Sequence, residues 1–347
     1  METLKFGVFG AGFWSNYQVA GWNEIEGVEL VAICDPDYEK AKLMAKKFEI
    51  PSVYSSAEKL LNHESLDFVD IITNVETHLP LAKLAASAGI HVVCQKPMAP
   101  SHKECLEMHR CCQDHGVDLY INENFRWQAP IRKVKHLMDS GQIGEVFKGR
   151  VTFCSAFPVF ENQPFLKQLD RFILTDIGSH ILDICRFLFG EVDNLRCLTK
   201  RVNKEIKGED VATVLMEMEN GIHCYAEMSY ASRLAKEVFP ETLLLVEGEK
   251  GSIELAADLT VHVTTKEGTT SQQVIPEPYH WVDPDYALIH SSIVDTQRDL
   301  LRGLRGGTAE TTGEDNLKTS QLVWACYQSA ENKELITLKD FSPYENT

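Results

Sequence analysis

The segment FGVFGAGFWSNY, residues 6–17, joins an apolar run to a helical pattern through two glycines. Gly10 and Gly12 directly follow the apolar run Leu4–Phe9, and glycines in this context permit a tight turn and a close approach of the backbone to a pyrophosphate at a helix N-terminus. Ser15, at the third small-residue position, still allows the helix to pack on the strand. On its own this match is weak, because an ordinary tight turn between a strand and a helix often produces it.

An acidic residue supports the glycine motif 23 residues after Gly12, where the run Val28–Cys34 ends in Asp35. Such a residue can accept hydrogen bonds from both hydroxyls of an adenosine ribose, and it would repel a 2′-phosphate. No arginine follows Asp35 in the stretch CDPDYEK. The pattern therefore predicts a dinucleotide site that prefers NAD over NADP. The alternative, Asp35 as a turn residue before Pro36, is disfavoured by the glycines.

Apolar runs alternate with helical patterns throughout the first third of the chain. This alternation is typical of βαβ units that form a doubly wound parallel sheet, the Rossmann arrangement, and predicts a dinucleotide-binding domain over residues 1–123. The expected strands are Leu4–Phe9, Val28–Cys34, Phe68–Thr73, His91–Cys94 and Val117–Ile121, and the expected helices are 13–24, 37–48, 76–88 and 101–115.

The pattern changes after residue 123, where runs rich in β-formers alternate in polarity and helical stretches become fewer. We expect an α+β domain over residues 124–347 that carries a large, mainly antiparallel, open sheet. The expected strands are 145–155, 211–218, 222–230, 242–247, 252–255, 259–265 and 271–275, and the expected helices are 128–140, 175–189, 285–305 and 313–332.

Composition excludes several classes of partner. The 347 residues include 34 basic and 51 acidic side chains, and the formal net charge of −17 repels nucleic acid and anionic lipid surfaces. No apolar stretch approaches the length of a membrane span. Ten scattered cysteines form no CxxC pair and no secretory leader precedes them, so we expect a cytoplasmic enzyme.

Three further motifs complete a resemblance to a known family. TNVETH at 73–78, QKP at 95–97 and TDIGSHILD at 175–183 follow the glycine turn in order and with compatible spacing. Together they resemble the Gfo/Idh/MocA family of NAD(P)-dependent oxidoreductases, which act on sugars, cyclitols and related polyols. The resemblance spans essentially the whole chain. It implies a dehydrogenase of an aldose-like sugar or polyol that forms a homodimer or homotetramer through the C-terminal sheet.

The resemblance also implies which residues lie beside the cofactor. One departs from the family pattern, because Gln95 stands where the family has glutamate; an amide can still bind a ribose hydroxyl but carries no charge. The family often has the peptide bond between Lys96 and Pro97 in the cis form. The expected cofactor contacts are Gly10, Gly12, Phe13, Trp14, Asp35, Thr73, Asn74, His78, Gln95 and Lys96.

Lys96, Asp176 and His180 are the candidate catalytic residues. Lys96 follows an apolar strand, and open parallel sheets bind ligands beyond the carboxyl ends of their strands. On a helix, Asp176 and His180 share one face, and a histidine can take the hydroxyl proton while a lysine stabilises the developing alkoxide. Two alternatives stay open: Asp176 as a helix cap with His180 in the core, or a metal pair. We expect no metal, because hydride transfer to NAD does not need one.

Candidate substrate residues come from two loops. Asn124, Arg126 and Trp127 offer an amide, a guanidinium and an aromatic wall, although Arg126 equally suits a salt bridge between domains and Trp127 equally suits the core. The loop FPVFENQPFL, residues 157–166, and its continuation add Phe157, Asn162 and Arg171. Asp176 and His180 are expected to contact the substrate as well. These stretches resemble the branch of the family that acts on D-apiose.

Two other functions remain alternatives at this point. An NAD-dependent glycoside hydrolase of the same fold would oxidise its substrate transiently and release no net NADH. A non-catalytic NAD-binding sensor would share the fold as well, but it would have no use for a proton-transfer pair beside the nicotinamide.

Overall fold

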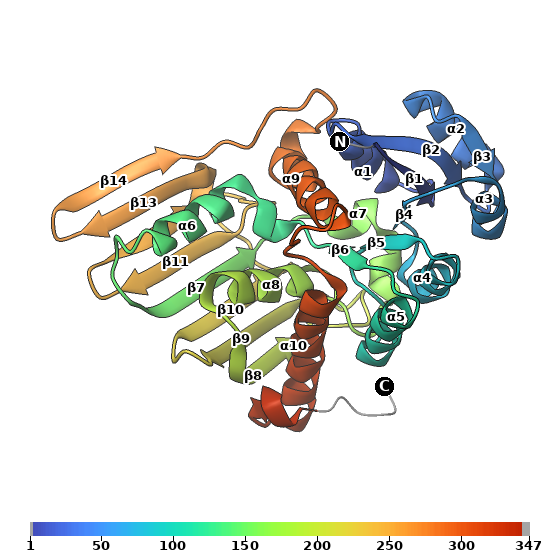
Figure 1. The fold of residues 1–347 in the computed structure, drawn as a ribbon. Helices are drawn as coiled ribbons and strands as arrows, with labels where there is room; N and C mark the ends of the chain where they lie inside the picture. Colours follow the sequence, from blue (N-terminus) through green and yellow to red (C-terminus); the bar gives the residue numbers. More distant parts are fainter. Residues whose placement is uncertain (1–2, 342–347) are drawn as a thin grey trace.

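The computed structural model describes residues 3–341, apart from the side chains of Asn162 and Asp340, and its first unit is a six-stranded sheet (Figure 1). All neighbouring strands run parallel, in the order β3-β2-β1-β4-β5-β6. This confirms the predicted Rossmann domain, and the reversal of strand order between β1 and β4 marks where ligands bind in such sheets. The strands are β1 (Leu4–Phe9), β2 (Val28–Cys34), β3 (Ser52–Tyr54), β4 (Phe68–Ile71), β5 (His91–Gln95) and β6 (Leu119–Asn122).

Helices cover both faces of this sheet. Two of them begin at a serine N-cap, because the hydroxyls of Ser56 and Ser101 accept hydrogen bonds from the amides of Lys59 and Glu104. β3 and α3 lie in a stretch that the periodicity left unassigned, since three and seven residues are too short to show a clear pattern. The helices are α1 (Ser15–Trp22), α2 (Tyr38–Phe48), α3 (Ala57–His63), α4 (His78–Ser87) and α5 (His102–Asp114).

The second unit contains a nine-stranded sheet in the order β14-β13-β12-β11-β7-β10-β9-β8-β15. Neighbouring strands are antiparallel except for β7 and β10, which confirms the mainly antiparallel sheet. The strands are β7 (Val146–Cys154), β8 (Val192–Lys200), β9 (Val211–Met218), β10 (His223–Ser229), β11 (Leu243–Gly248), β12 (Gly251–Ala256), β13 (Thr260–Thr265), β14 (Gly268–Gln273) and β15 (Ile336–Thr337).

Strand β8 was not expected from the sequence. Its buried residues are Val192, Leu195 and Cys197, so the apolar spacing is three and then two. The pairing of β8 with β9 shifts register between Val192 and Asn194. A bulge at this point adds one residue and so interrupts the period of two that marks a strand.

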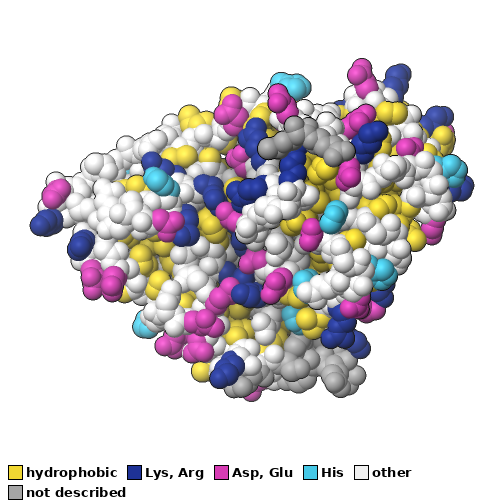
Figure 2. Space-filling view, viewed as in Figure 1, with side chains coloured by type: hydrophobic (Ala, Val, Ile, Leu, Met, Phe, Trp, Pro, Cys, Tyr) yellow, Lys and Arg dark blue, Asp and Glu magenta, His cyan; other side chains and the backbone are white. Residues whose placement is uncertain are grey.

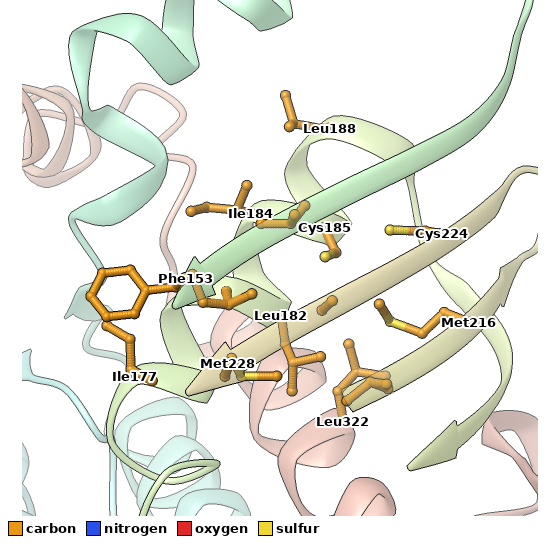
Figure 3. Close-up of a cluster of buried hydrophobic side chains, with 14 of the residues drawn as sticks. Phe153, Ile177, Leu182, Ile184, Cys185, Leu188, Met216, Cys224, Met228 and Leu322 are labelled. Carbon is orange, nitrogen blue, oxygen red and sulfur yellow. The ribbon is translucent and has the colours of Figure 1, made fainter. Parts of the chain in front are cut away.

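Three helices cover one face of the nine-stranded sheet: α6 (Ala129–Asp139), α8 (Ile177–Phe189) and α10 (Gly313–Asn332) (Figure 1). Figure 3 shows the core beneath α8, where Leu182 and Cys185 point toward Cys224 and Met228 of β10. Leu198 and Leu215 lie on the opposite face and are 62% and 58% exposed. The remaining helical segments are α7 (Val159–Asn162) and the 3₁₀ segments Val75–Thr77, Phe125–Trp127, Pro164–Gln168, Ala257–Leu259, Pro284–Tyr286 and Leu338–Asp340.

Helix α9 (Ala287–Leu304) lies far along the chain but packs against α1 of the first domain. Its Leu300 shares a core with α1 and α2, while α3, α4 and α5 cover the other face. The side-chain amide of Gln297 donates to the carbonyl of Gln18 at 2.8 Å. The division into domains at residue 123 stays a prediction. Helix α9 comes after this residue in the chain but completes the helical layer on one face of the parallel sheet.

On the face shown in Figure 2, Lys and Arg side chains lie interspersed with Asp and Glu side chains. Among the residues that the structure describes, no helix has the length and apolar character needed to cross a membrane.

Candidate active site

A cavity of about 2030 Å³ lies between the two domains. Its walls include the carboxyl ends of β1, β4 and β5, with Gly10, Asn74 and Lys96, and the start of α8, with Asp176 and His180. Typical small-molecule pockets measure about 300–1,000 Å³. The cavity therefore has room for a dinucleotide together with a second ligand.

The glycine turn forms one end of this cavity. Gly10 has a φ of +103°, and a Cβ there would lie 2.3 Å from the carbonyl oxygen of Ile72, so no other residue fits. A Cβ on Gly12 would meet nothing within 4 Å, because this residue faces the open cavity. The open space at Gly12 would accommodate a pyrophosphate at the N-terminus of α1.

Asp35 is fixed at the rim of the same end. Its Oδ2 accepts from the amide of Ala11 at 2.8 Å and its Oδ1 accepts from the amide of Asp37 at 2.8 Å. These bonds hold the carboxylate beside the glycine turn, where the ribose of a bound dinucleotide would lie. The residues present thus fit NAD.

The other expected cofactor residues line this cavity too: Phe13, Trp14, Thr73, Asn74, His78 and Gln95. His78 is buried, with Nδ1 lying 3.0 Å from the carbonyl oxygen of Pro97 and Nε2 lying 3.2 Å from that of Thr73. Burial lowers the pKa of His78. The neutral imidazole can donate to one of these two carbonyls, and it lies between the loop after β4 and the turn that carries Lys96. The peptide bond between Lys96 and Pro97 is cis.

Gln95 takes part in a directed chain of hydrogen bonds. The amide of Lys96 donates to Oε1 of Gln95 at 2.7 Å, and Nε2 of Gln95 donates to Oε1 of Gln18 at 2.8 Å. Nε2 of Gln18 then donates to both carboxylate oxygens of Asp70 at 2.9 Å. Gln95 must donate to Gln18 in this arrangement, which a carboxylate cannot do.

Asp70 ends the chain as a fully buried carboxylate. It also accepts from Nε1 of Trp22 at 2.8 Å and from Nδ2 of Asn122 at 3.4 Å. Burial raises the pKa of Asp70 from 3.8 to about 7, against the opposing effect of the hydrogen bonds from Trp22 and Gln18. The acidic group near this part of the site is therefore the buried Asp70, whereas the side chain of Gln95 is neutral.

Lys96 and Asp176 meet on the cavity wall. Nζ of Lys96 lies 3.5 Å from Oδ1 of Asp176 and 3.4 Å from its carbonyl oxygen. Asp176 occupies the N-cap position of α8, but its side chain makes no capping hydrogen bond. It instead accepts from the hydroxyl of Tyr230 at 3.5 Å. The carboxylate therefore faces the cavity and does not cap the helix.

His180 lies in the next turn of α8 and is 3% exposed. Its Nδ1 is hydrogen-bonded to Oε1 of Glu123, and the ring of Phe125 stacks on it with centroids 3.8 Å apart and planes 7° apart. Burial raises the pKa of Glu123 to about 7. Burial, and then the charge of Lys96, lowers the pKa of His180 well below its usual value.

Sequence reasoning missed two residues on this wall, Glu123 and Tyr230. Glu123 directly follows β6, Tyr230 directly follows β10, and both line the cavity. A polar residue at such a strand end was the available signal. For Glu123 it was masked by the neighbouring polar residues of NENFRW, among which Asn124 and Arg126 were preferred.

Five of the expected substrate residues line the cavity: Asp176 and His180, described above, and Asn124, Phe157 and Arg171. Nδ2 of Asn124 donates to Oγ of Ser292 at 2.8 Å, so part of its amide is engaged by α9. The ring of Phe157 stacks on Phe239 at 3.8 Å. Their contact with a substrate stays a prediction.

Arg126 and Trp127 do not line the cavity. Arg126 is buried, with Nε 2.7 Å from Oδ2 of Asp183 and Nη2 2.8 Å from Oδ2 of Asp315. Trp127 lies under the guanidinium of Arg132 at 4.2 Å. Arg126 thus forms salt bridges, but with α8 and α10 of its own predicted domain rather than between domains, and Trp127 is half-buried.

The side chain of Asn162 lies outside the described part of the structure. Among residues 3–341, no group of three or more His, Cys, Asp or Glu side chains is arranged to hold a metal ion.

Comparison with known proteins identifies the family. Residues 4–123 match the Gfo/Idh/MocA oxidoreductase family with its NAD-binding Rossmann fold, and residues 131–254 match the Gfo/Idh/MocA C-terminal domain. The chain is 43% identical to a D-apiose dehydrogenase of Paraburkholderia graminis, over 98% of this chain and 91% of that protein. It is 41% identical to a D-apiose dehydrogenase of Rhizobium rhizogenes, over 96% of each.

A solved structure extends this likeness to three dimensions. The crystal structure of an oxidoreductase from Agrobacterium radiobacter in complex with NAD⁺, L-tartaric acid and magnesium has a TM-score of 0.94 and 41% identity to this chain. The match covers 97% of this chain and 98% of that one. With both domain matches in place, the chain belongs to the Gfo/Idh/MocA family of oxidoreductases with an NAD-binding Rossmann fold.

Proposed function

We propose that this oxidoreductase is an NAD-dependent sugar dehydrogenase and that its substrate is D-apiose. The observation that carries the dehydrogenase assignment is the convergence of Lys96, Asp176 and His180 on one wall of a cavity at the carboxyl end of the parallel sheet. The substrate assignment is supported by two D-apiose dehydrogenases at 43% and 41% identity over nearly the whole chain.

The glycine turn and Asp35 would hold the cofactor. Gly10 and Gly12 leave room for the pyrophosphate at the N-terminus of α1, and the Asp35 carboxylate would accept from the ribose hydroxyls. The same carboxylate would repel a 2′-phosphate, which supports NAD over NADP. Bound NAD⁺ supplies the acceptor for a hydride from the carbon that carries the reacting hydroxyl.

The protein's own residues manage the proton and the developing charge. His180 takes the hydroxyl proton as a general base, a role that typically contributes about 10²–10⁴-fold in rate. The Lys96 ammonium stabilises the oxygen as negative charge develops on it. Asp176, 3.5 Å from Lys96, orients that ammonium and faces the cavity beside Tyr230, where it is placed to accept from a sugar hydroxyl.

NADH formation tests the proposed function directly. Purified protein is assayed with D-apiose, other aldoses and inositols, with NAD⁺ and NADP⁺ in parallel. We expect turnover of D-apiose with NAD⁺ as the preferred cofactor. Absence of turnover on the whole panel, with NAD⁺ binding shown by calorimetry, would contradict the proposal. Release of a free sugar from an aryl glycoside without net NADH would instead identify the hydrolase alternative.

We further propose a cytoplasmic homodimer or homotetramer that forms through the nine-stranded sheet. The face of this sheet opposite α8 exposes Leu198 and Leu215, which lie on the neighbouring strands β8 and β9. Covering these side chains would remove apolar surface from water. The cytoplasmic assignment is supported by the ten cysteines, all of which are free thiols.

A further inference from the structure

We propose that Glu123 positions His180 for proton transfer by holding the hydrogen on Nδ1, so that Nε2 is left as the base. This role rests on the proposed function, since it concerns the proton of the hydroxyl that is oxidised. His180 remains the catalytic residue, because in the proposed function it would take the proton of the reacting hydroxyl. Glu123 acts through His180 and is a positioning residue.

The geometry restrains the imidazole from two directions. Oε1 of Glu123 is hydrogen-bonded to Nδ1, and the Phe125 ring lies parallel to the imidazole at a centroid distance of 3.8 Å. An ionised carboxylate can only accept hydrogen bonds, so this contact requires the hydrogen of a neutral His180 to be on Nδ1. The lone pair of Nε2 is then free. Both Glu123 and His180 line the cavity, so the base lies where the substrate binds.

The surroundings of Glu123 make its partnership with His180 strong. Glu123 is fully buried, and within the described residues its Oε2 has no hydrogen-bond partner. Besides the contact with His180, Oε1 receives one long hydrogen bond among the described residues, from the amide of Phe125 at 3.4 Å. A buried carboxylate with so few donors interacts strongly with a positive charge that forms next to it. The imidazolium formed in the reaction is such a charge.

Charged groups face the pair from four elements. The turn after β5, the segment Phe125–Trp127, α8 with its N-cap, and α10 contribute Lys96, Arg126, Asp176, Asp183 and Asp315. Lys96 lies near both members and favours loss of a proton from each of them. Because Oε1 of Glu123 and Nδ1 of His180 share a hydrogen bond, the two groups titrate as a pair rather than separately.

The proposed step balances in charge and atoms. The O–H bond of the substrate breaks and its proton passes to Nε2 of His180, while the hydride on the same carbon passes to the nicotinamide. The Nδ1 hydrogen of the imidazolium stays hydrogen-bonded to the Glu123 carboxylate, so the positive charge of His180 and the negative charge of Glu123 stay paired. The proton then leaves Nε2 to water, which restores the neutral imidazole.

A direction of pH dependence follows from this step. When the pair binds one proton, Nε2 carries hydrogen in either arrangement and cannot act as a base. The rate of oxidation therefore rises with pH through the ionisation of the pair. Glu123→Gln keeps an acceptor for Nδ1 but removes the negative charge, so His180 binds its proton less tightly and the rise moves to lower pH.

The test compares Glu123→Gln and Glu123→Asp with a surface control, Glu29→Gln, which is exposed on β2. The substrate is whichever sugar of the panel yields NADH. For Glu123→Gln we expect kcat at the plateau to fall about 10- to 100-fold and the midpoint of the pH profile to fall by about one unit. The Kd for NAD⁺ should be unchanged. Glu123→Asp should keep the original midpoint, because it keeps the charge. A lowered kcat with an unmoved midpoint in Glu123→Gln would overturn the proposal.

A second measurement needs neither a folded variant at Glu123 nor a known substrate. A hydrogen shared between Nδ1 and a carboxylate gives a strongly deshielded proton resonance in the wild-type protein. We expect this resonance to be present without substrate and to be absent in His180→Ala. A wild-type protein without it would overturn the role of Glu123. A protein that shows it but oxidises no sugar of the panel would contradict the proposed function alone.

Discussion

The hydrogen-bond chain from Lys96 to Asp70 predicts the effect of introducing, at position 95, the glutamate of the family pattern. In Gln95→Glu, the new side chain cannot donate to Oε1 of Gln18. The one amide group of Gln18 then faces carboxylates on both sides and can donate to only one of them. The loss of a hydrogen bond costs about 1 kcal/mol and a buried unsatisfied acceptor about 1–3 kcal/mol. We therefore expect Gln95→Glu to lower the free energy of unfolding by about 3 kcal/mol.

Moving the carboxylate rather than adding one should reverse this loss. In the double variant Gln95→Glu with Asp70→Asn, the whole chain can run in the opposite direction. Gln18 donates to the introduced carboxylate at position 95, the introduced amide at position 70 donates to Gln18, and the oxygen of that amide still accepts from Trp22. Asp70→Asn alone removes the buried charge but places two amide nitrogens opposite each other, which offsets part of that gain at pH 8. We expect a coupling energy of about 2–4 kcal/mol in favour of the double variant.

Urea denaturation at pH 8 measures all four members of this cycle, and Gln113→Glu, at an exposed position on α5, is the matched control. The control should change stability by less than about 0.5 kcal/mol. The reasoning is refuted if Gln95→Glu is as well tolerated as the control, or if the two changes simply add.

The pH dependence of stability gives an independent check on Asp70. Its pKa in the folded protein is raised from 3.8 to about 7, so the folded state binds this proton more tightly than the unfolded chain does. The stabilisation that comes from protonation of Asp70 is therefore complete below about pH 3.8. It is lost as the pH rises through about 7, which changes the free energy of unfolding by about 4 kcal/mol. Asp70→Asn should remove this part of the pH dependence, and a profile parallel to that of the wild type would contradict the assignment.

Three further predictions concern the chemistry, the cofactor and the assembly. Lys96→Met and His180→Ala should each lower kcat by about 100-fold or more while NAD⁺ binding, measured by calorimetry, persists; loss of NAD⁺ binding in both would contradict the assigned roles. Asp35→Ala should weaken NAD⁺ binding more than NADP⁺ binding, and an unchanged affinity for NAD⁺ would remove Asp35 from the ribose site. Leu215→Glu should dissociate the oligomer in sedimentation experiments, whereas Leu335→Glu, also at an exposed leucine, should not; a monomeric wild-type protein would refute the assembly.

Much of the fold could be predicted because its signals are local. The runs Leu4–Phe9, Val28–Cys34 and Val211–Met218 coincide with strands residue for residue, and residues 313–332 form the expected helix. Each of the three strands is a short, mainly apolar or alternating run that a polar or glycine-containing turn follows. β8 escaped prediction because a bulge breaks its period, and β3 because three residues carry too little pattern.

The candidate site could be predicted only in part, because its motifs identify side chains without their partners. Lys96 and Asp176 were expected together, and they lie 3.5 Å apart. Glu123 was not expected, although it is hydrogen-bonded to His180, 57 positions away. From the sequence, Arg126 was as good a candidate for substrate binding as its polar neighbours. In the structure it contacts carboxylates of α8 and α10 and does not line the cavity.

The sequence by itself determined the two domain types, the dinucleotide turn and the residues that define the family, because these depend on periodicity and spacing within short segments. Only the tertiary structure decided what each polar side chain contacts. Gln95 meets Gln18 across 77 positions, and α9 returns from the far end of the chain to pack on α1. Such contacts arise when distant segments bury their apolar faces together, and every buried polar group must then find whichever partner the packing brings within reach.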